Sequence, residues 1–175
     1  MVPAVVDLVP TGVEELSEGQ AIFQKLADHV NHVKPLHVKG FINGKLVNNM
    51  LVDNGTTVNL MTYSLYKKLG GSDEELIKTK RTVKGAGENS ISAKGFALMK
   101  LTIGSKTLAT IFFVVEVQVS YSLILGREWI HGNQCVPSSL HQFLIQWVNN
   151  EVEIVHADSS AYTTVDAPLL GGIMI

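Results

Sequence analysis

The sequence has few of the residues that crosslink or anchor a chain. It has a single cysteine, Cys135, so no disulfide can form within one chain, which fits a reducing compartment. No apolar run approaches the roughly 18 residues that a membrane-spanning helix needs. The first ten residues are apolar but contain Asp7 and have no basic start, so they do not match a signal peptide. We therefore expect a soluble, intracellular, cytoplasmic protein without a membrane partner.

Charge is also sparse and evenly mixed. Only 17% of the residues are charged, with 14 basic against 16 acidic side chains, and neither sign forms a long run. Nucleic-acid binding needs a concentrated basic patch, so we expect no nucleic-acid partner.

His29 and His32 lack a further ligand at a supporting spacing, which predicts no metal site. Gly85-Ala86-Gly87 lacks the third glycine of a dinucleotide-binding motif, and we predict no cofactor. Ser138 and Ser139 have no nearby base that would activate a serine nucleophile.

Local patterns divide the chain into three parts. Within residues 1–34, acidic and apolar residues alternate at a loose helical spacing that ends at Pro35, which predicts a flanking, partly helical segment. Short, β-rich segments separated by glycine follow, and we assign residues 35–148 to one domain. Residues 149–175 are predicted to form a partly disordered tail, with a strand-like run at 152–155 near its start.

Glycine-containing turns predict β-hairpins within the domain. Asn43-Gly44 accepts the positive φ values of a type I′ turn, and Gly104-Ser105 marks a second tight connection. The predicted strands are Leu36–Ile42, Lys45–Val52, Thr79–Lys84, Ile91–Ala97, Phe96–Ile103, Thr107–Val117, Ser122–Leu125 and Phe143–Val148. Short helices are predicted at Val58–Leu69 and Arg127–His131. The pattern indicates one mostly antiparallel β-domain with one or two short helices.

The most informative stretch surrounds Asp53. Leu51 and Val52 precede this carboxylate at the end of a predicted apolar strand, and Gly55 follows two residues later. The strand places the carboxylate against an apolar wall, and the glycine lets backbone amides approach it closely. Asp-Asn-Gly is also an ordinary turn sequence, so this stretch alone leaves both a plain turn and a reactive carboxylate open.

A second block, residues 123–127, follows about 70 residues downstream and reads Leu-Ile-Leu-Gly-Arg. An apolar pair before Asp-x-Gly, a glycine-tipped hairpin and an apolar pair before Gly-Arg stand in the order seen in retroviral and retrotransposon aspartic proteases. In particular, residues 52–61 and 124–131 resemble the protease region of a plant long-terminal-repeat retrotransposon (gag-pol) polyprotein. Residues 136–142 resemble the segment after the second block. The resemblance covers roughly residues 35–145.

This resemblance implies a fold, a reaction and a partner. The fold is a mainly β, retropepsin-like acid-protease lobe, a closed or partly open β-barrel with one or two short helices. The reaction is that of an aspartic-type endopeptidase, in which two aspartates share one proton and position a water for attack on a peptide carbonyl. Asp-x-Gly occurs once, at Asp53, so the second aspartate must come from another copy. The resemblance therefore implies a homodimer that cuts an extended peptide or polyprotein substrate.

The resemblance also assigns roles to individual residues. It makes Asp53 the catalytic residue. The other assignments are Asn54, Gly55 and Thr56 for the active-site turn, Gly85, Ala86 and Gly87 for the flap that closes over the substrate, and Leu125, Gly126 and Arg127 for support of the turn.

Two positions depart from the family pattern. Family members most often have Ser or Thr between the aspartate and the glycine, with a hydroxyl that links the two lobes, whereas this chain has the longer, planar amide of Asn54. Arg127 in the family commonly pairs with an acidic residue, but the matching position here is Thr57, so the arginine needs another partner or stays solvated. An alternative interpretation is a catalytically weak or inactive module of the same fold that dimerises or binds peptides.

Overall fold

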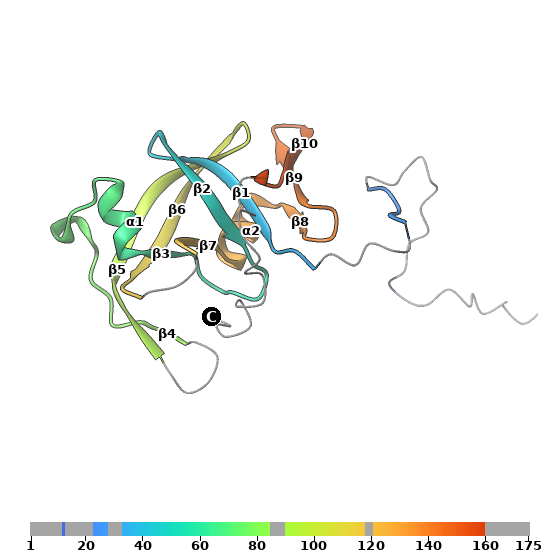
Figure 1. Cartoon of the computed structure of the whole chain (residues 1–175). Helices are drawn as coiled ribbons and strands as arrows, with labels where there is room; N and C mark the ends of the chain where they lie inside the picture. The colour runs from blue at the N-terminus through green and yellow to red at the C-terminus, as the bar shows by residue number, and fades with distance from the viewer. Residues whose placement is uncertain (1–11, 13–22, 28–32, 85–89, 118–120, 160–175) are drawn as a thin grey trace, which may run out of the picture. The chain divides into compact units, whose positions relative to one another are not determined.

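The computed structural model describes residues 12, 23–27, 33–84, 90–117 and 121–159 (Figure 1). The chain divides into two units, residues 1–31 and 32–175. The second unit contains every helix and strand of the described residues. Of the helical segment predicted within residues 1–34, the part at 23–27 is not helical, and most of the rest lies outside the described residues.

The described elements are mostly strands, with two short α-helices, which agrees with the predicted mainly β class. In chain order they are β1 (Leu36–Ile42), β2 (Lys45–Val52), β3 (Leu60–Thr62), α1 (Tyr63–Lys68), a 3₁₀ turn (Asp73–Glu75), β4 (Thr82–Lys84), β5 (Ser90–Ile103), β6 (Lys106–Val115), β7 (Leu123–Leu125), α2 (Arg127–Asn133), β8 (Val136–Ser138), β9 (Phe143–Val148) and β10 (Glu151–His156).

Six of these strands close into a barrel. Their order is β1-β2-β7-β3-β6-β5, and pairing of β5 with β1 closes the ring, while β4 continues the sheet beyond β5 (Figure 1). The β2–β7 and β3–β6 pairs are parallel and the other pairs in the ring are antiparallel. Closure removes most of the free edges that an open sheet would expose. The β-barrel expected from the sequence is confirmed, and it is closed.

Alternation along the strands places one side of each strand in the core. On β1, Leu36, Val38 and Ile42 are buried, whereas Lys39 and Phe41 are exposed, as a period of two residues requires. The largest side chains with almost no exposure are Tyr66, Phe112, Leu36, Ile42, Met50, Met61, Leu101, Ile103, Leu123, Ile124, Leu125 and Leu144. These side chains come from both helical and strand segments. All but Ile124 belong to one large apolar cluster, and Ile124 belongs to a second, smaller cluster with Leu51 and Leu60.

The hairpins agree with the prediction at their turns and differ in the length of one strand. Asn43 and Gly44 have φ values of 48° and 80°, as a type I′ turn requires. The two strands predicted at 91–97 and 96–103 are a single strand, β5, of 14 residues. A register shift between Ala93 and Gly95 lets β5 bend without ending, because a bulge absorbs one residue.

The helix predicted at Val58–Leu69 is wrong in its first half. Leu60–Thr62 forms β3, which lies between β6 and β7, and the helix begins only at Tyr63. The Thr62 hydroxyl accepts a hydrogen bond from the Leu65 amide (3.3 Å) and caps the helix. Leu60 and Met61 are both buried, because a central strand buries both of its faces, and their tertiary pairing overrides the helical spacing.

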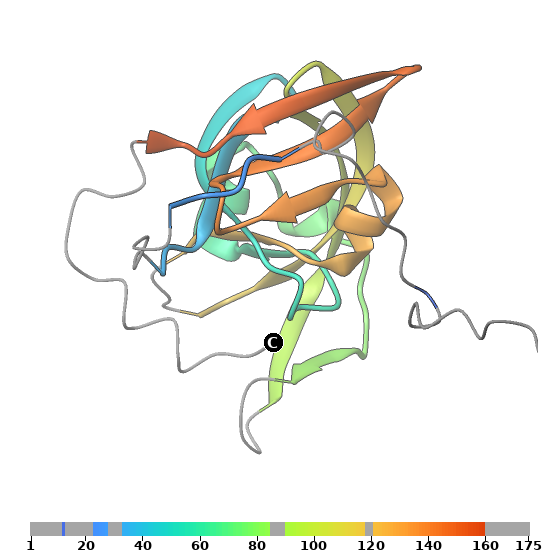
Figure 2. The ribbon, with the colours of Figure 1, turned by 90° about the vertical axis from the view of Figure 1, so that its right-hand side faces the viewer.

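A second, three-stranded sheet in the order β10-β9-β8 packs beside the barrel (Figure 2). Leu144 of β9 is fully buried, and the Gln146 amide donates to the Ile103 carbonyl (2.8 Å). The strand-like run predicted at 152–155 is part of β10, which pairs with β9 over its whole length. Regular strand pairing thus continues beyond residue 148, to His156. The domain boundaries and the partly disordered tail stay predictions.

Glu153 of β10 joins the small sheet to the β5–β6 turn. Its carboxylate accepts hydrogen bonds from the Ser105 hydroxyl, the Gln146 amide (2.8 Å) and the Ser105 backbone amide (3.2 Å). These bonds favour the charged form and, led by the Ser105 hydroxyl, lower the pKa of Glu153. Because the pKa of Glu153 is lower in the folded chain than in the unfolded chain, its ionised carboxylate stabilises the fold at pH values above the unfolded pKa. This contribution is lost as the pH falls through the pKa of the folded state.

We therefore predict an acid-sensitive contribution from Glu153. Glu153→Gln should unfold at a lower urea concentration than the wild type at about pH 7, and the difference should shrink toward about pH 3. Urea titrations of both proteins at several pH values would measure this. The exposed Glu151→Gln serves as the control, and an equal effect of the two substitutions would count against the role of Glu153.

Candidate active site

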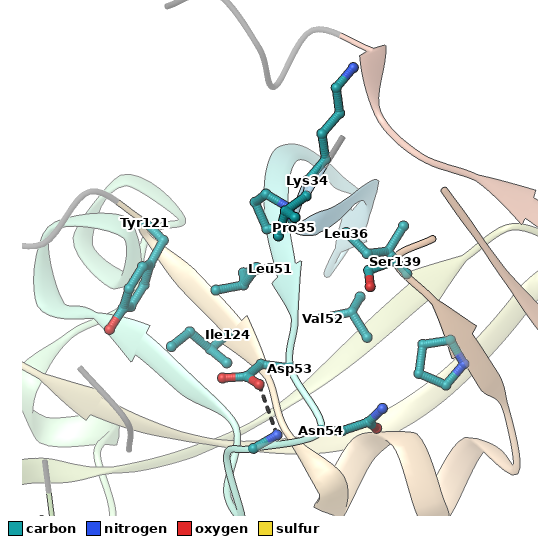
Figure 3. Close-up of a pocket in the computed structure, with 13 residues that line it drawn as sticks. Lys34, Pro35, Leu36, Leu51, Val52, Asp53, Asn54, Tyr121, Ile124 and Ser139 are labelled. Atoms are coloured by element: carbon teal, nitrogen blue, oxygen red, sulfur yellow. Dashed lines mark hydrogen bonds between the residues drawn. The ribbon is translucent and has the colours of Figure 1, made fainter. Parts of the chain in front are cut away.

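The parallel pairing of β2 with β7 brings the two sequence blocks together. Leu51 pairs with Ile124 and Val52 with Leu125, and the Asp53 amide then donates to the Leu125 carbonyl (3.0 Å). The chain turns directly after Asp53, so its carboxylate stands at the end of two buried strands (Figure 3). The predicted proximity of Asp53 and Leu125 is therefore present in the structure.

The Asp53 carboxylate is held by its own turn. The Gly55 amide donates to Asp53 Oδ1 (2.8 Å) and the Thr56 hydroxyl donates to Oδ2 (2.7 Å). Asp53 is half-buried, Thr56 is fully buried, and Asn54 and Gly55 are exposed. Each carboxylate oxygen has one donor from the turn, so the carboxylate is fixed in orientation and keeps further acceptor capacity.

The buried Thr56 hydroxyl gives a testable stability term. Thr56→Val keeps the shape and removes the donor to Asp53 Oδ2, so we expect a loss of about 1 to 2 kcal/mol in the free energy of unfolding. Urea unfolding at neutral pH would measure the loss. Thr56→Ser retains the hydroxyl and serves as the matched control. Equal stability of Thr56→Val and the wild type would show that this bond contributes nothing.

The second block supports the turn through backbone contacts at Gly126. The Gly126 amide donates to Asn59 Oδ1 (2.9 Å), and Asn59 in turn donates to the Ile111 carbonyl (3.1 Å). The next amide, that of Arg127, donates to the Thr56 carbonyl (2.7 Å). A Cβ atom at Gly126 would lie 2.3 Å from the Val58 carbonyl oxygen, so only glycine allows this close approach.

Asn59 is a supporting residue that the sequence analysis missed. It is 1% exposed, and its side chain links β7 to β6 across the base of the turn. The sequence feature that could have identified Asn59 is its position as a polar residue between the apolar Val58 and Leu60, in a stretch predicted to be helical. A buried amide in an apolar run needs partners for its donors and acceptor, so its position implied a structural hydrogen-bond network.

Arg127 has partners in the turn despite the absence of an acidic residue at position 57. Its guanidinium donates to the Thr57 hydroxyl (2.7 Å) and to the Asn54 carbonyl (3.1 Å). The alternative of a solvated arginine is therefore wrong. Thr57 takes the place of the carboxylate, and the planar guanidinium holds both ends of the exposed part of the turn.

A pocket of about 530 Å³ opens beside Asp53 (Figure 3). Its lining residues are Val33, Lys34, Pro35, Leu36, Leu51, Val52, Asp53, Asn54, Gly55, Tyr121, Ile124, Pro137 and Ser139. Burial, and then the negative charge of Asp53, raise the pKa of the Tyr121 hydroxyl, which has no hydrogen-bond partner among the described residues. Most of the wall is apolar, so the pocket fits an apolar side chain next to one carboxylate.

Tyr121 lines the pocket, and the sequence analysis missed it. It stands two residues before the second block, in a stretch whose neighbours at 118–120 lie outside the described residues. An aromatic residue directly before an apolar strand suggests core packing rather than a pocket wall. Its ring packs with the apolar cluster around Leu51 and Ile124, so Tyr121 both packs against the core and forms part of the pocket wall.

The flap assignment lies outside the described residues, because Gly85, Ala86 and Gly87 fall in the gap at 85–89. The flanking strands do pair, with Thr82 opposite Ser92 and Val83 opposite Ile91, so the predicted hairpin is present at its base. The flap role itself stays a prediction.

Ser138 has a base nearby, contrary to the sequence analysis. Its Oγ atom lies 2.8 Å from His141 Nδ1 and also accepts a hydrogen bond from the His141 backbone amide (3.2 Å). This is the pattern of a serine side chain that accepts from the backbone three residues later and so caps a turn. In the part of the chain that the structure describes, no cluster of three metal-ligating side chains occurs, and no helix is long and apolar enough to span a membrane.

The closed barrel and the braced Asp53 turn define a retropepsin-like lobe. A family model described as aspartyl protease matches residues 38–129, more than half of the 175 residues. The chain belongs to this aspartyl protease family. No curated protein matches it by sequence.

Three solved structures are similar to this chain, and the first of them shares its fold. The retroviral protease-like domain of Ddi1 from Leishmania major is 20% identical, with a TM-score of 0.58 over 76% of this chain and 100% of that chain. The EIAV protease in complex with the inhibitor HBY-793 is 20% identical, with a TM-score of 0.43 over 58% and 90%. A retropepsin-like aspartic protease from Rickettsia conorii is 18% identical, with a TM-score of 0.45 over 68% and 80%.

Proposed function

We propose that the chain is one lobe of a homodimeric aspartic endopeptidase and that Asp53 is its catalytic residue. The observation that carries the proposal is the Asp53 carboxylate, oriented by two hydrogen bonds at an open, largely apolar pocket. Of the described residues that line this pocket, Asp53 is the only carboxylate. Acid and base catalysis by two carboxylates therefore requires a second copy of the chain.

The proposed chemistry follows from two carboxylates at close range. Two like charges that share a site do not both ionise, so the pair holds one proton between them. The ionised carboxylate takes a proton from a water as that water attacks the peptide carbonyl, and the protonated one donates to the developing oxyanion. In each copy, Gly55 and Thr56 fix the carboxylate before the substrate binds, which lowers the cost of reaching the reactive geometry.

The proposed substrate is an extended peptide within a polyprotein. The apolar walls formed by Leu51, Val52 and Ile124 fit apolar side chains beside the scissile bond. The segment that contains Gly85, Ala86 and Gly87 acts as the flap over the peptide. The likeness of residues 52–61 and 124–131 to plant retrotransposon proteases supports maturation of a retrotransposon gag-pol polyprotein as the role.

The test is cleavage of a peptide library by the purified chain at roughly pH 4 to 6, where such pairs hold one shared proton. A second measurement tests the dimer. Adding about nine parts of Asp53→Asn to one part of wild type should lower activity per wild-type chain about tenfold, because random pairing leaves few dimers with two aspartates.

The control for this mixing experiment is the same excess of Asp73→Asn, which changes an exposed carboxylate that bonds Tyr63 (2.6 Å) and should leave activity unchanged. Activity that is unaffected by Asp53→Asn would show that one chain acts alone.

An alternative function is a non-catalytic peptide-binding or dimerisation module. The exposed Asn54 favours it, because its amide makes no hydrogen bond within the described chain. A folded dimer that cleaves no peptide would support this alternative.

A further inference from the structure

One apolar surface of the chain lies mostly outside the core and outside the pocket. In the sheet β8–β9–β10, Leu144 and Gln146 point to the barrel, and side chains alternate along each strand. The residues between them therefore point away from the barrel. We call this side of the sheet the outer face. It consists of Val136, Ser138, Phe143, Ile145, Trp147, Val152, Ile154 and His156.

The outer face is apolar and contiguous, and of its residues only the central Ile145 is buried, at 9% exposure. Val136, Trp147, Val152 and Ile154 are 60%, 50%, 48% and 47% exposed. Trp147 pairs with Val152, and Val136 and Ile154 both lie opposite Ile145, so the four side chains form one surface. Single exposed apolar residues are ordinary, but a contiguous group of this kind marks a place where another segment or molecule binds.

We propose that residues 160–175 of the same chain dock on the outer face. The segment reads SAYTTVDAPLLGGIMI and has one charged side chain, Asp166. The residues before it are fixed near the sheet, since the Ala157 amide donates to the Gln142 carbonyl (2.9 Å) and the Asp158 amide to the His37 carbonyl (2.8 Å). Gln142 directly precedes Phe143 of the outer face, so the segment starts beside its binding surface.

Reach and attachment favour this segment as the occupant. At about 3.3 Å per extended residue, residues 160–175 can span roughly 50 Å, whereas a six-residue strand such as β10 spans about 20 Å. Attachment to the sheet through Ser159 also gives a high effective concentration at the outer face, so docking avoids the entropy cost of associating two molecules. The segment can therefore cover the whole outer face.

The chemistry of the segment matches the outer face. Its apolar residues fit Val136, Trp147 and Ile154, and Asp166 complements His156, which is the basic side chain of that face. Pro168 and the pair at 171–172 interrupt strand pairing, which favours packing across the outer face over a fourth strand at the free edge of β10.

Trp147 fluorescence in the full chain tests this proposal. Trp129 is 4% exposed in the core, whereas Trp147 is 50% exposed and is the tryptophan that docking would cover. In the double variant Leu169→Ser, Leu170→Ser, the acrylamide quenching constant should rise roughly twofold and the emission should shift to longer wavelength, because apolar docking is lost. The matched control, Thr163→Ser with Thr164→Ser, should leave both unchanged.

Two further measurements assign the signal. In a Trp147→Phe background the Leu169→Ser, Leu170→Ser change should have no effect on fluorescence. An unchanged quenching constant in the double variant with Trp147 present overturns the proposal. Protection of Trp147 that disappears on dilution also overturns it, because a second copy would then be the occupant. None of these outcomes depends on peptide cleavage, so the proposal stands or falls separately from the proposed protease.

Discussion

Replacing Asp53 with asparagine should remove peptide cleavage while the fold persists. General acid and base catalysis by a positioned carboxylate contributes about 10²- to 10⁴-fold to a rate, and an amide can neither share the proton nor take one from water. We expect cleavage by Asp53→Asn to fall by that factor. The measurement is kcat/KM of the purified variant on the best peptide found with the wild type.

The substitution is chosen so that structural loss does not explain its effect. Asparagine has the shape of aspartate, its carbonyl can still accept the Gly55 amide, and the Thr56 hydroxyl can turn to accept from the new amide. Stability should therefore change by about 1 kcal/mol or less. A variant that loses cleavage but unfolds at the same urea concentration as the wild type would support a catalytic role. Retained cleavage would place the chemistry elsewhere.

The sequence predicts the site better than the elements that carry it. The Asp53 turn and the block at 123–127 are recognisable because their chemistry needs a local order of residues, with apolar positions before an aspartate or a glycine. Their contact is a parallel pairing of β2 with β7, which no local pattern states. The resemblance to known proteases supplied this contact, and periodicity alone would not have.

The errors have a common physical cause. Leu60 and Met61 have the spacing of a helix but lie in a central strand, because burial on both faces removes the alternation that identifies strands. The missed Asn59 depends on partners 52 and 67 residues away. Long-range partners of this kind are decided by tertiary packing, so a single sequence does not reveal them.

Gly126→Ala should destabilise the barrel more than an ordinary surface substitution. The new methyl group would lie 2.3 Å from the Val58 carbonyl oxygen and 2.7 Å from the Thr56 carbonyl oxygen, and both atoms belong to the backbone. Relief requires movement of the turn itself, and overpacking of this kind costs about 3 kcal/mol. For a chain of this size we expect the melting temperature to fall by roughly 6 to 12 °C.

A glycine in the next helix provides the matched control for this prediction. Gly132 lies in α2, and a Cβ there would meet nothing within 4 Å, so Gly132→Ala should be neutral or stabilise the helix by up to about 1 kcal/mol. Thermal unfolding of both variants compares the same chemical change in two environments.

Because Gly126 also donates to Asn59 and adjoins the residue that binds the Thr56 carbonyl, its displacement moves the turn that orients Asp53. Cleavage should therefore fall in Gly126→Ala even below its melting temperature, and normal cleavage by a destabilised Gly126→Ala would show that the second block supports the fold without positioning the carboxylate.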